Sequence, residues 1–227
     1  MNVGVVVFPG SNCDHDAWFT VSHDLHHHAE FIWHDSDSIG NVDLVILPGG
    51  FAYGDYLRCG AIAKFSPVMD AVKKFARDGG YVLGICNGFQ VLTESGLLPG
   101  ALVRNASLKY VCRTVPLEVV TTNTPFTRNA IKGQTLRIPI GHGEGCYVTD
   151  EQTLDRLEAE DRVVLRYREN VNGSLRNIAG IVNEQRNVMG LMPHPERAAD
   201  PLLGNTDGLT ILNSLLSSPT LSLTCDP

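Results

Sequence analysis

The sequence YVLGICNGFQ occupies residues 81–90. Its first five residues are apolar, as expected for a short buried strand, and the part from Gly88 onward suits the start of a helix. Cys86 falls at the junction, between Gly84 and Gly88. Glycines at these two places allow the tight turn called a nucleophile elbow, which lifts a side chain above the sheet at a helix N-terminus. The helix dipole there favours a thiolate. We therefore interpret Cys86 as a nucleophile, and a buried structural cysteine is the alternative.

Strands and helices alternate on both sides of this stretch. We expect strands at 3–8, 29–34, 42–47, 163–167, 178–182 and 188–192, and helices at 67–77 and from an Asn205 or Thr206 cap to about 216. Apolar strands that alternate with helices indicate an α/β fold with a mostly parallel sheet covered on both faces. Residues 111–140 differ: two expected strands, 115–121 and 136–140, are joined by a Thr/Asn/Pro-rich loop. We interpret them as a mixed or antiparallel insertion in a single domain that spans residues 1–227.

Composition excludes several classes of protein. The 227 residues, 43% of them hydrophobic, are enough to bury a sizeable core. Lys and Arg number 18 against 25 Asp and Glu, a net charge of −7, so no basic surface for nucleic acid is expected. The apolar run 3–8 is too short to cross a membrane and follows no basic leader. The six cysteines form no C-x-x-C pair and share no metal-ligand spacing with nearby histidines. We expect a cytoplasmic protein with free thiols, no metal and no membrane partner.

A base for Cys86 is offered by the sequence MPHPER at residues 192–197, which follows another expected strand. In an extended segment, residues i and i+2 point the same way, so Glu196 is placed to orient the imidazole of His194. The alternative is a Pro-rich surface turn with an exposed histidine. Because both Cys86 and His194 follow parallel strands, we expect them to meet at one edge of the sheet.

A third glycine-rich segment, PGGFAYGD at residues 48–55, also follows an expected strand. Backbone N–H groups near Gly50 could approach a ligand closely, as an oxyanion hole requires. No G-x-x-x-x-G-K-[ST] sequence occurs in the chain, and no G-x-G-x-x-G follows a strand. We therefore expect that this chain binds neither ATP nor a dinucleotide itself.

With Cys86, His194 and Glu196 as a Cys-His-Glu set, the chain resembles the class I, or triad, glutamine amidotransferases, which have a flavodoxin-like fold. Within that class it is similar to the glutaminase subunits of phosphoribosylformylglycinamidine synthase in purine biosynthesis. The narrower resemblance rests on motifs along nearly the whole chain: PGSNCD at 9–14, PGGFAYGDYLR at 48–58, GICNGFQ at 84–90, HGEG at 142–145, NGS at 172–174 and PHPER at 193–197.

The resemblance implies a reaction and its residues. Cys86 would attack the side-chain amide of L-glutamine, His194 would act as base and then acid, and Glu196 would orient it. N–H groups near Gly50 and of Asn87 would hold the oxyanion, and Gln90 would help hold the substrate. The ammonia would pass to a large ATP-dependent synthase subunit, which carries the ATP and Mg²⁺, with a small third subunit in the complex. No cofactor is expected on this chain.

Other features carry weaker predictions. A metal site at His26-His27-His28 has no completing carboxylate or thiol, and a solvated helix face is the better interpretation. We interpret His142 and Glu144 as lining the site or, preferably, the subunit interface. Tyr53 and Arg58 suit a lid or a docking loop. Cys13 lies after the first strand and is taken as structural. Two other functions stay open at this point: another elbow-type cysteine hydrolase, and a flavodoxin-like binding module without catalysis.

Overall fold

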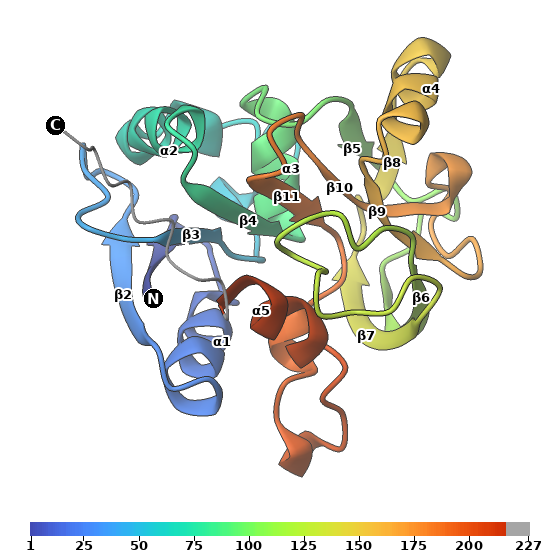
Figure 1. Ribbon diagram of the computed structural model, residues 1–227. Coiled ribbons are helices and arrows are strands. Elements are labelled where there is room, and N and C mark those ends of the chain that lie inside the picture. Colours follow the sequence, from blue (N-terminus) through green and yellow to red (C-terminus); the bar gives the residue numbers. More distant parts are fainter. Residues whose placement is uncertain (217–227) are drawn as a thin grey trace, which may run out of the picture.

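The computed structural model describes residues 1–216, which form a nine-stranded sheet with helices on both faces (Figure 1). The strand order is β2-β1-β3-β4-β11-β10-β9-β6-β7. The strands of this sheet are β1 (Asn2–Val7), β2 (His28–Trp33), β3 (Leu44–Leu47), β4 (Tyr81–Ile85), β6 (Val111–Val119), β7 (Thr135–His142), β9 (Val163–Tyr167), β10 (Ile178–Val182) and β11 (Val188–Leu191).

Helices cover the two faces of the parallel part of this sheet. Figure 1 shows α2 and α3 above the sheet and α1 and α5 below it. The α-helices are α1 (Asp14–Phe19), α2 (Pro67–Arg77), α3 (Asn87–Glu94), α4 (Glu151–Ala159) and α5 (Leu209–Leu216). One turn of π-helix, η1 (Thr20–Asp24), continues α1, and the 3₁₀ segments are η2 (Ala52–Asp55), η3 (Ala63–Phe65), η4 (Leu175–Asn177), η5 (Pro195–Arg197) and η6 (Pro201–Leu203).

The parallel strands bring the expected functional segments to one edge. β1, β2, β3, β4 and β11 all run in the same direction, and Ile85 at the end of β4 pairs with Leu191 at the end of β11. The chain segments that follow these two strands therefore leave the sheet side by side. Central strands are buried on both faces, and β3 is buried at every residue, which explains its uninterrupted apolar sequence. The predicted α/β fold with a mostly parallel sheet is confirmed.

The insertion predicted for residues 111–140 extends the same sheet. β6 pairs antiparallel with both β7 and β9, and β10 pairs antiparallel with both β9 and β11. Parallel pairing thus ends at β11, and the remaining four strands form an antiparallel half. Two short strands that we did not predict, β5 (Ala101–Val103) and β8 (Cys146–Val148), form a separate two-stranded sheet.

The last helix starts later than predicted. The side-chain oxygen of Asn205 accepts the N–H of Asp207 at 3.0 Å, but the chain continues through a turn at residues 207 and 208, so neither Asn205 nor Thr206 directly precedes the helix. The carboxylate of Asp207 in turn accepts the backbone N–H of Arg137 at 2.7 Å. These contacts hold the segment against β7, and α5 begins only at Leu209. The predicted tail from residue 217 lies outside the described residues.

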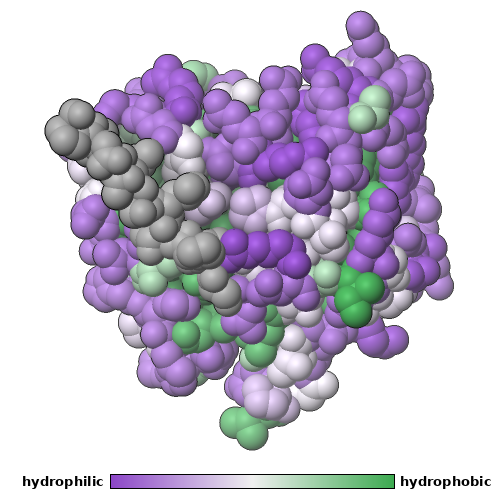
Figure 2. Space-filling view, in the orientation of Figure 1, coloured by the Kyte–Doolittle hydropathy of each residue, from purple (hydrophilic) through white to green (hydrophobic). Residues whose placement is uncertain are grey.

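The visible surface is mostly polar, as expected for a chain with this composition. The face seen in Figure 2 is mostly hydrophilic, with separate apolar patches. Within residues 1–216, no helix is long and apolar enough to cross a bilayer. The cysteines in this range, Cys13, Cys59, Cys86, Cys112 and Cys146, are all free thiols, and Cys225 lies outside it.

Candidate active site

Cys86 occupies a strained turn between β4 and α3. Its backbone has φ 51° and ψ −105°, a conformation that costs a non-glycine residue about 1–3 kcal/mol. Hydrogen bonds on both sides hold the turn: the Cys86 N–H donates to the carbonyl of Leu191 at 2.8 Å, and the Cys86 carbonyl accepts from Phe89 at 3.0 Å. The backbone is therefore fixed by β11 on one side and by the first turn of α3 on the other.

The two glycines beside Cys86 are required by close packing. A Cβ on Gly88 would lie 1.9 Å from the carbonyl oxygen of Leu47, and one on Gly84 would lie 2.7 Å from the carbonyl oxygen of Gly88. Any side chain at either position would push α3 away from the sheet. The sequence interpretation of both glycines as elements of a tight elbow therefore agrees with the packing.

His194 lies just beyond β11, and its side chain is held by Glu196. The His194 Nδ1–H donates to Glu196 Oε1 at 2.6 Å, and both side chains are buried, 3% and 1% exposed. The pair forms differently from our prediction, since the segment is not extended: His194 has φ −103° and ψ 88°, and Pro195 begins the 3₁₀ turn η5. That turn carries the carboxylate of Glu196 back toward the imidazole, whereas a continuous strand would have set the two side chains in parallel.

The charge on His194 is controlled by its neighbours. Burial alone lowers its pKa, but the carboxylate of Glu196 and the sulfur of Cys86 raise it, so that the pKa of His194 lies well above the usual 6.5. These neighbours therefore favour the imidazolium form of His194. An imidazolium stabilises a neighbouring thiolate, which is the reactive form of cysteine.

Cys86 and His194 meet at Gly49, a residue that sequence reasoning passed over in favour of Gly50. A Cβ on Gly49 would lie 2.7 Å from His194 Cε1, 3.2 Å from Cys13 Sγ and 3.4 Å from Cys86 Cβ. The three side chains thus surround one position that only glycine leaves free. A cavity of about 50 Å³ opens there, lined by Asn12, Cys13, Gly50, Phe51, Cys86, Tyr110, Gly141, His194 and Arg197.

Gly50 and Asn87 border the same elbow. Gly50 has φ +140° and bridges to Ser11, so its backbone is held in a conformation that favours glycine. Asn87 is the first residue of α3, where backbone N–H groups have no partner within the helix. Its side-chain oxygen accepts the N–H of Ala52 at 3.1 Å, which ties the glycine-rich loop to the elbow. This placement is compatible with the predicted oxyanion role, which stays a prediction.

Five other predicted residues lie outside the cavity lining. His142 Nδ1 lies 3.1 Å from Asn105 Oδ1. Gln90 donates to the Glu144 carbonyl at 2.6 Å, and its own oxygen accepts from Asn87 at 2.9 Å. The hydroxyl of Tyr53 contacts His34 Nδ1 and Ser66 Oγ, both at 2.8 Å. Arg58 pairs with Glu94, and the carboxylate of Glu144 lies 3.6 Å from Arg104 Nε. Each of these side chains therefore already has a partner within the chain. The predicted role of Gln90 in substrate binding stays a prediction.

Sequence reasoning undervalued Cys13. Its sulfur lines the cavity and accepts from Arg197 Nη2 at 3.2 Å. The available signal was its position after β1, a parallel strand like those before Cys86 and His194. Cys13, His194 and Glu196 also offer ligand atoms within 4.8 Å of one another, which resembles a metal site. Because His194 Nδ1 and a Glu196 oxygen share a hydrogen bond, we interpret this group as a hydrogen-bonded cluster.

Tyr110 and Gly141 also line the cavity, and no local sequence pattern predicted them. They reach the cavity only because β6 and β7 pair with one another, which places Tyr110, just before β6, and Gly141, near the end of β7, at the site.

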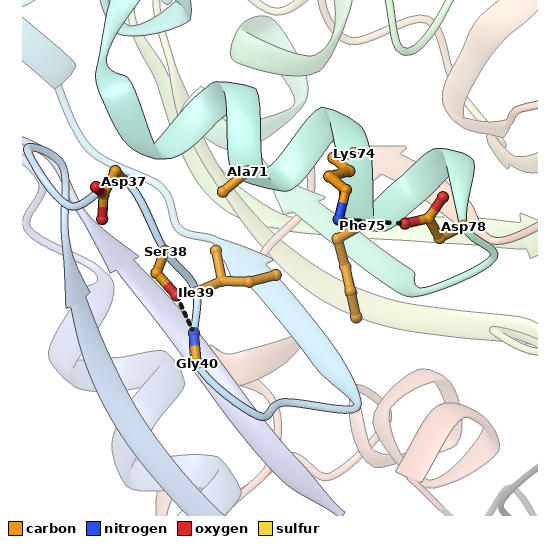
Figure 3. A pocket seen from close by; sticks show the side chains of 8 residues that line it. All are labelled: Asp37, Ser38, Ile39, Gly40, Ala71, Lys74, Phe75 and Asp78. Atoms are coloured by element: carbon orange, nitrogen blue, oxygen red, sulfur yellow. Dashed lines mark hydrogen bonds and ion pairs between the residues drawn. The ribbon is translucent and has the colours of Figure 1, made fainter.

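A larger hollow lies at the opposite edge of the sheet. Its volume is about 330 Å³, and it lies between the loop before β3 and the C-terminal half of α2 (Figure 3). Figure 3 shows the Lys74 side chain directed toward Asp78, and Lys74 Nζ lies 4.0 Å from Asp78 Oδ2. Ligands of α/β sheets bind at the carboxyl ends of the strands, and this hollow lies at their amino ends. The small cavity at Cys86 is therefore the candidate active site.

Comparison with known proteins identifies the family. Residues 1–207 match the CobB/CobQ-like glutamine amidotransferase domain. Phosphoribosylformylglycinamidine synthase subunit PurQ of Koribacter versatilis is 57% identical over 96% of this chain and 98% of that protein. The same subunit of Alkaliphilus metalliredigens is 56% identical, over 95% of this chain and 96% of its own length.

A solved structure agrees with these relatives. The structure of PurLQS from Thermotoga maritima contains a chain that is 46% identical to this one and superimposes with a TM-score of 0.88. The match covers 95% of this chain and 97% of that chain. Identity, coverage and fold point the same way: the chain belongs to the CobB/CobQ-like glutamine amidotransferases and, among them, to the PurQ glutaminase subunits of phosphoribosylformylglycinamidine synthase.

Proposed function

We propose that Cys86, His194 and Glu196 hydrolyse L-glutamine in this chain. The thiolate of Cys86 attacks the side-chain amide carbon, and the C–N bond breaks as His194 gives its proton to the leaving nitrogen, which departs as ammonia. A glutamyl thioester remains on Cys86. Water, deprotonated by His194, then attacks the thioester and releases glutamate and the thiolate. The observation that carries the proposal is the strained turn of Cys86, which faces a buried His194–Glu196 pair across Gly49.

The developing negative charge on the amide oxygen needs hydrogen-bond donors. The candidates are the N–H of Asn87, which follows Cys86 at the start of α3, and the N–H near Gly50, a residue that lines the cavity. Donors fixed in a water-poor site before the reaction stabilise such a charge strongly. We assign the oxyanion hole to these two groups, and Glu196 keeps the His194 ring oriented throughout.

The ammonia serves a synthase on another chain. We infer that this subunit works with PurL and PurS, the partners that the name of the PurLQS relative implies. The large subunit would bind ATP and Mg²⁺ and convert formylglycinamide ribonucleotide to formylglycinamidine ribonucleotide. This chain has a net charge of −7 and no phosphate-binding loop, which supports a division of labour in which it needs no cofactor. Its free thiols support a cytoplasmic location.

One domain is sufficient for this role. A single sheet runs from β2 through the site to β7, and segments from both its parallel and antiparallel halves line the cavity. We therefore propose that residues 1–227 act as one amidotransferase domain.

The size of the cavity predicts that the isolated chain is slow. A volume of about 50 Å³ holds one or a few waters but not a glutamine, so the site has to widen before substrate enters. We expect glutamine hydrolysis to be slow for the chain alone and to rise when the synthase subunits are added.

The test is to mix the chain with PurL and PurS, ATP, Mg²⁺ and formylglycinamide ribonucleotide, and to measure glutamate and amidine formation with and without glutamine. A fast rate for the isolated chain, unchanged by the partners, would contradict the expected dependence on docking. Absence of any glutamine-dependent amidation in the complete mixture would contradict the function itself.

A further inference from the structure

The hydroxyl of Thr20 joins α1 to the segment that carries the catalytic histidine. Thr20 is 2% exposed and lies where α1 passes into the π-helical turn η1. Serine and threonine hydroxyls inside helices ordinarily donate to the carbonyl four residues earlier. Ser22, in the same turn, does so, and its Oγ lies 2.6 Å from the carbonyl oxygen of Trp18. The Thr20 hydroxyl instead donates to the backbone carbonyl of Glu196 at 3.0 Å, 176 residues away in the chain.

This contact holds the backbone of the residue that orients His194. The carbonyls of His194 and Pro195 accept backbone N–H groups from within their own segment. The carbonyl of Glu196 accepts the Thr20 hydroxyl, and this hydrogen bond is buried. The turn η5 is therefore fixed from outside at the one residue whose carboxylate contacts the imidazole.

The carboxylate of Glu196 has few other restraints. Its Oε1 accepts the Nδ1–H of His194 at 2.6 Å. Its Oε2 is buried and has no hydrogen-bond partner among residues 1–216. A side chain that contacts its target through one oxygen is aimed accurately only when its backbone and its surroundings are fixed. The geometry of the His194–Glu196 pair thus depends on how firmly the Glu196 backbone is held.

Two other contacts join α1 to the same turn. Arg197 Nε donates to Asp16 Oδ2 at 2.9 Å, and Arg197 Nη2 donates to Cys13 Sγ at 3.2 Å. The ion pair of Arg197 and Asp16 is partly exposed, with side chains 44% and 43% accessible, so water screens it and it contributes little. Loss of the Thr20 hydroxyl would leave a buried carbonyl without this donor, which is more costly. Thr20 is therefore the strongest candidate among these links.

We propose that Thr20 is a positioning residue for glutamine hydrolysis: its hydroxyl holds the Glu196 backbone and so keeps the carboxylate on His194 Nδ1. The inference rests on the proposed glutamine hydrolysis. Thr20 is not among the residues that line the cavity, so it acts through Glu196 rather than on the substrate. No bond is made or broken at Thr20.

The test is the variant Thr20→Val in the complete complex with PurL and PurS. Valine keeps the shape of the side chain and removes the hydroxyl. We expect kcat for glutamine-dependent amidation to fall about five- to tenfold, the effect of losing one hydrogen bond, and KM for glutamine to stay unchanged. Thr20→Ser keeps the hydroxyl and should retain the rate within about twofold. Thr20→Ala makes the same comparison with Thr20→Ser in the event that valine prevents folding.

Thr127→Val is the matched control. Thr127 is buried, its hydroxyl donates to the backbone carbonyl of Thr121 at 2.7 Å, and it does not line the cavity. The substitution removes the same kind of hydrogen bond far from the His194–Glu196 pair in the chain, so it should lower stability in urea as Thr20→Val does and leave kcat unchanged. An equal kcat in the two variants would overturn the proposal and leave Thr20 with a structural role alone.

A pH profile separates positioning from stability. The Glu196 carboxylate raises the pKa of His194, and the reaction needs the imidazolium to protonate the leaving nitrogen. A loosened contact lowers that pKa, so the alkaline limb of kcat/KM should move to lower pH in Thr20→Val and stay in place in Thr127→Val. Neither variant alters the other titratable and charged groups near His194, which include Cys13, Cys86, Tyr110, His142 and Arg197.

The double variant Thr20→Val, Glu196→Gln tests whether Thr20 acts through Glu196. Once the negative charge is gone, removal of the Thr20 hydroxyl should move the alkaline limb no further. An alkaline limb that stays in place in Thr20→Val alone would contradict the proposal, and so would a raised KM with unchanged kcat.

Failure of this inference differs from failure of the proposed function. Amidation driven by added ammonium chloride should be equal in Thr20→Val and the unaltered complex, because it bypasses the glutaminase. An equal loss of both reactions would overturn the positioning role, since the variant would then disturb the assembly. If the unaltered complex shows no glutamine-dependent amidation, the proposed function fails instead.

Discussion

Replacement of Cys86 by alanine is expected to lower glutamine-dependent amidation by a factor on the order of 10³ or more. Without the sulfur no thioester forms, and neither the oxyanion donors nor the His194–Glu196 pair can replace it as a nucleophile. Amidation driven by added ammonium chloride should remain, because that reaction bypasses this subunit. The measurement is the rate of amidine formation by the complex with each nitrogen source.

Cys112→Ala is the matched control for this experiment. Cys112 is an exposed free thiol on β6 and does not line the cavity. Its removal should leave both rates within a factor of about two, as for a typical surface substitution. Comparable losses in the two variants, or retention of glutamine-dependent activity in Cys86→Ala, would show that the nucleophile is a different group.

Replacement of Glu196 by glutamine should have the second largest effect. The glutamine oxygen can still accept the His194 Nδ1–H, but the negative charge that raises the pKa of His194 is lost. By analogy with removal of the acid in other triads, we expect the glutamine-dependent rate to fall about 10²–10⁴-fold. Glu118→Gln, a partly exposed carboxylate 3.7 Å from Arg168, is the control and should keep the rate.

The raised pKa of His194 predicts that the stability contributed by its pair with Glu196 depends on pH. The pKa of His194 in the folded chain lies above its unfolded value of 6.5, so the pair with Glu196 contributes its full stability below about pH 6.5. That contribution disappears as pH rises through the folded pKa. The difference in unfolding free energy between the unaltered chain and Glu196→Gln should thus be larger at pH 6 than at pH 9, measured by urea denaturation. A difference that grows with pH would contradict the raised pKa.

The parallel half of the fold could be predicted from local patterns, because each element there carries a clear signal. β4 and α2 have their predicted bounds, since an apolar run precedes Gly84 and Pro67 fits the first turn of a helix. Helix α4 was missed although signals existed: Asp150 caps it by accepting the N–H of Thr153, and Leu154 and Leu157 form its buried face. β5 and β8 are three residues long, too short for a periodic pattern.

Some residues of the candidate site could likewise be predicted from the sequence, and others could not. Cys86 and His194 could be predicted because each follows a parallel strand, and the order of these strands fixes where their ends meet. Gly49, Tyr110 and Gly141 could not, because their role depends on tertiary contacts that no local pattern records. The same holds for His142: its motif was visible, but its contact with Asn105, 37 residues away, was not.

The central claim is that glutamine becomes attached to Cys86, and covalent labelling tests it most directly. The complex is incubated with a chloroketone analogue of glutamine, digested, and examined by mass spectrometry. We predict a label on Cys86 that excess glutamine prevents and that Cys86→Ala abolishes. Labelling of the neighbouring Cys13 instead, or no labelling in the presence of the partner subunits, would contradict the account.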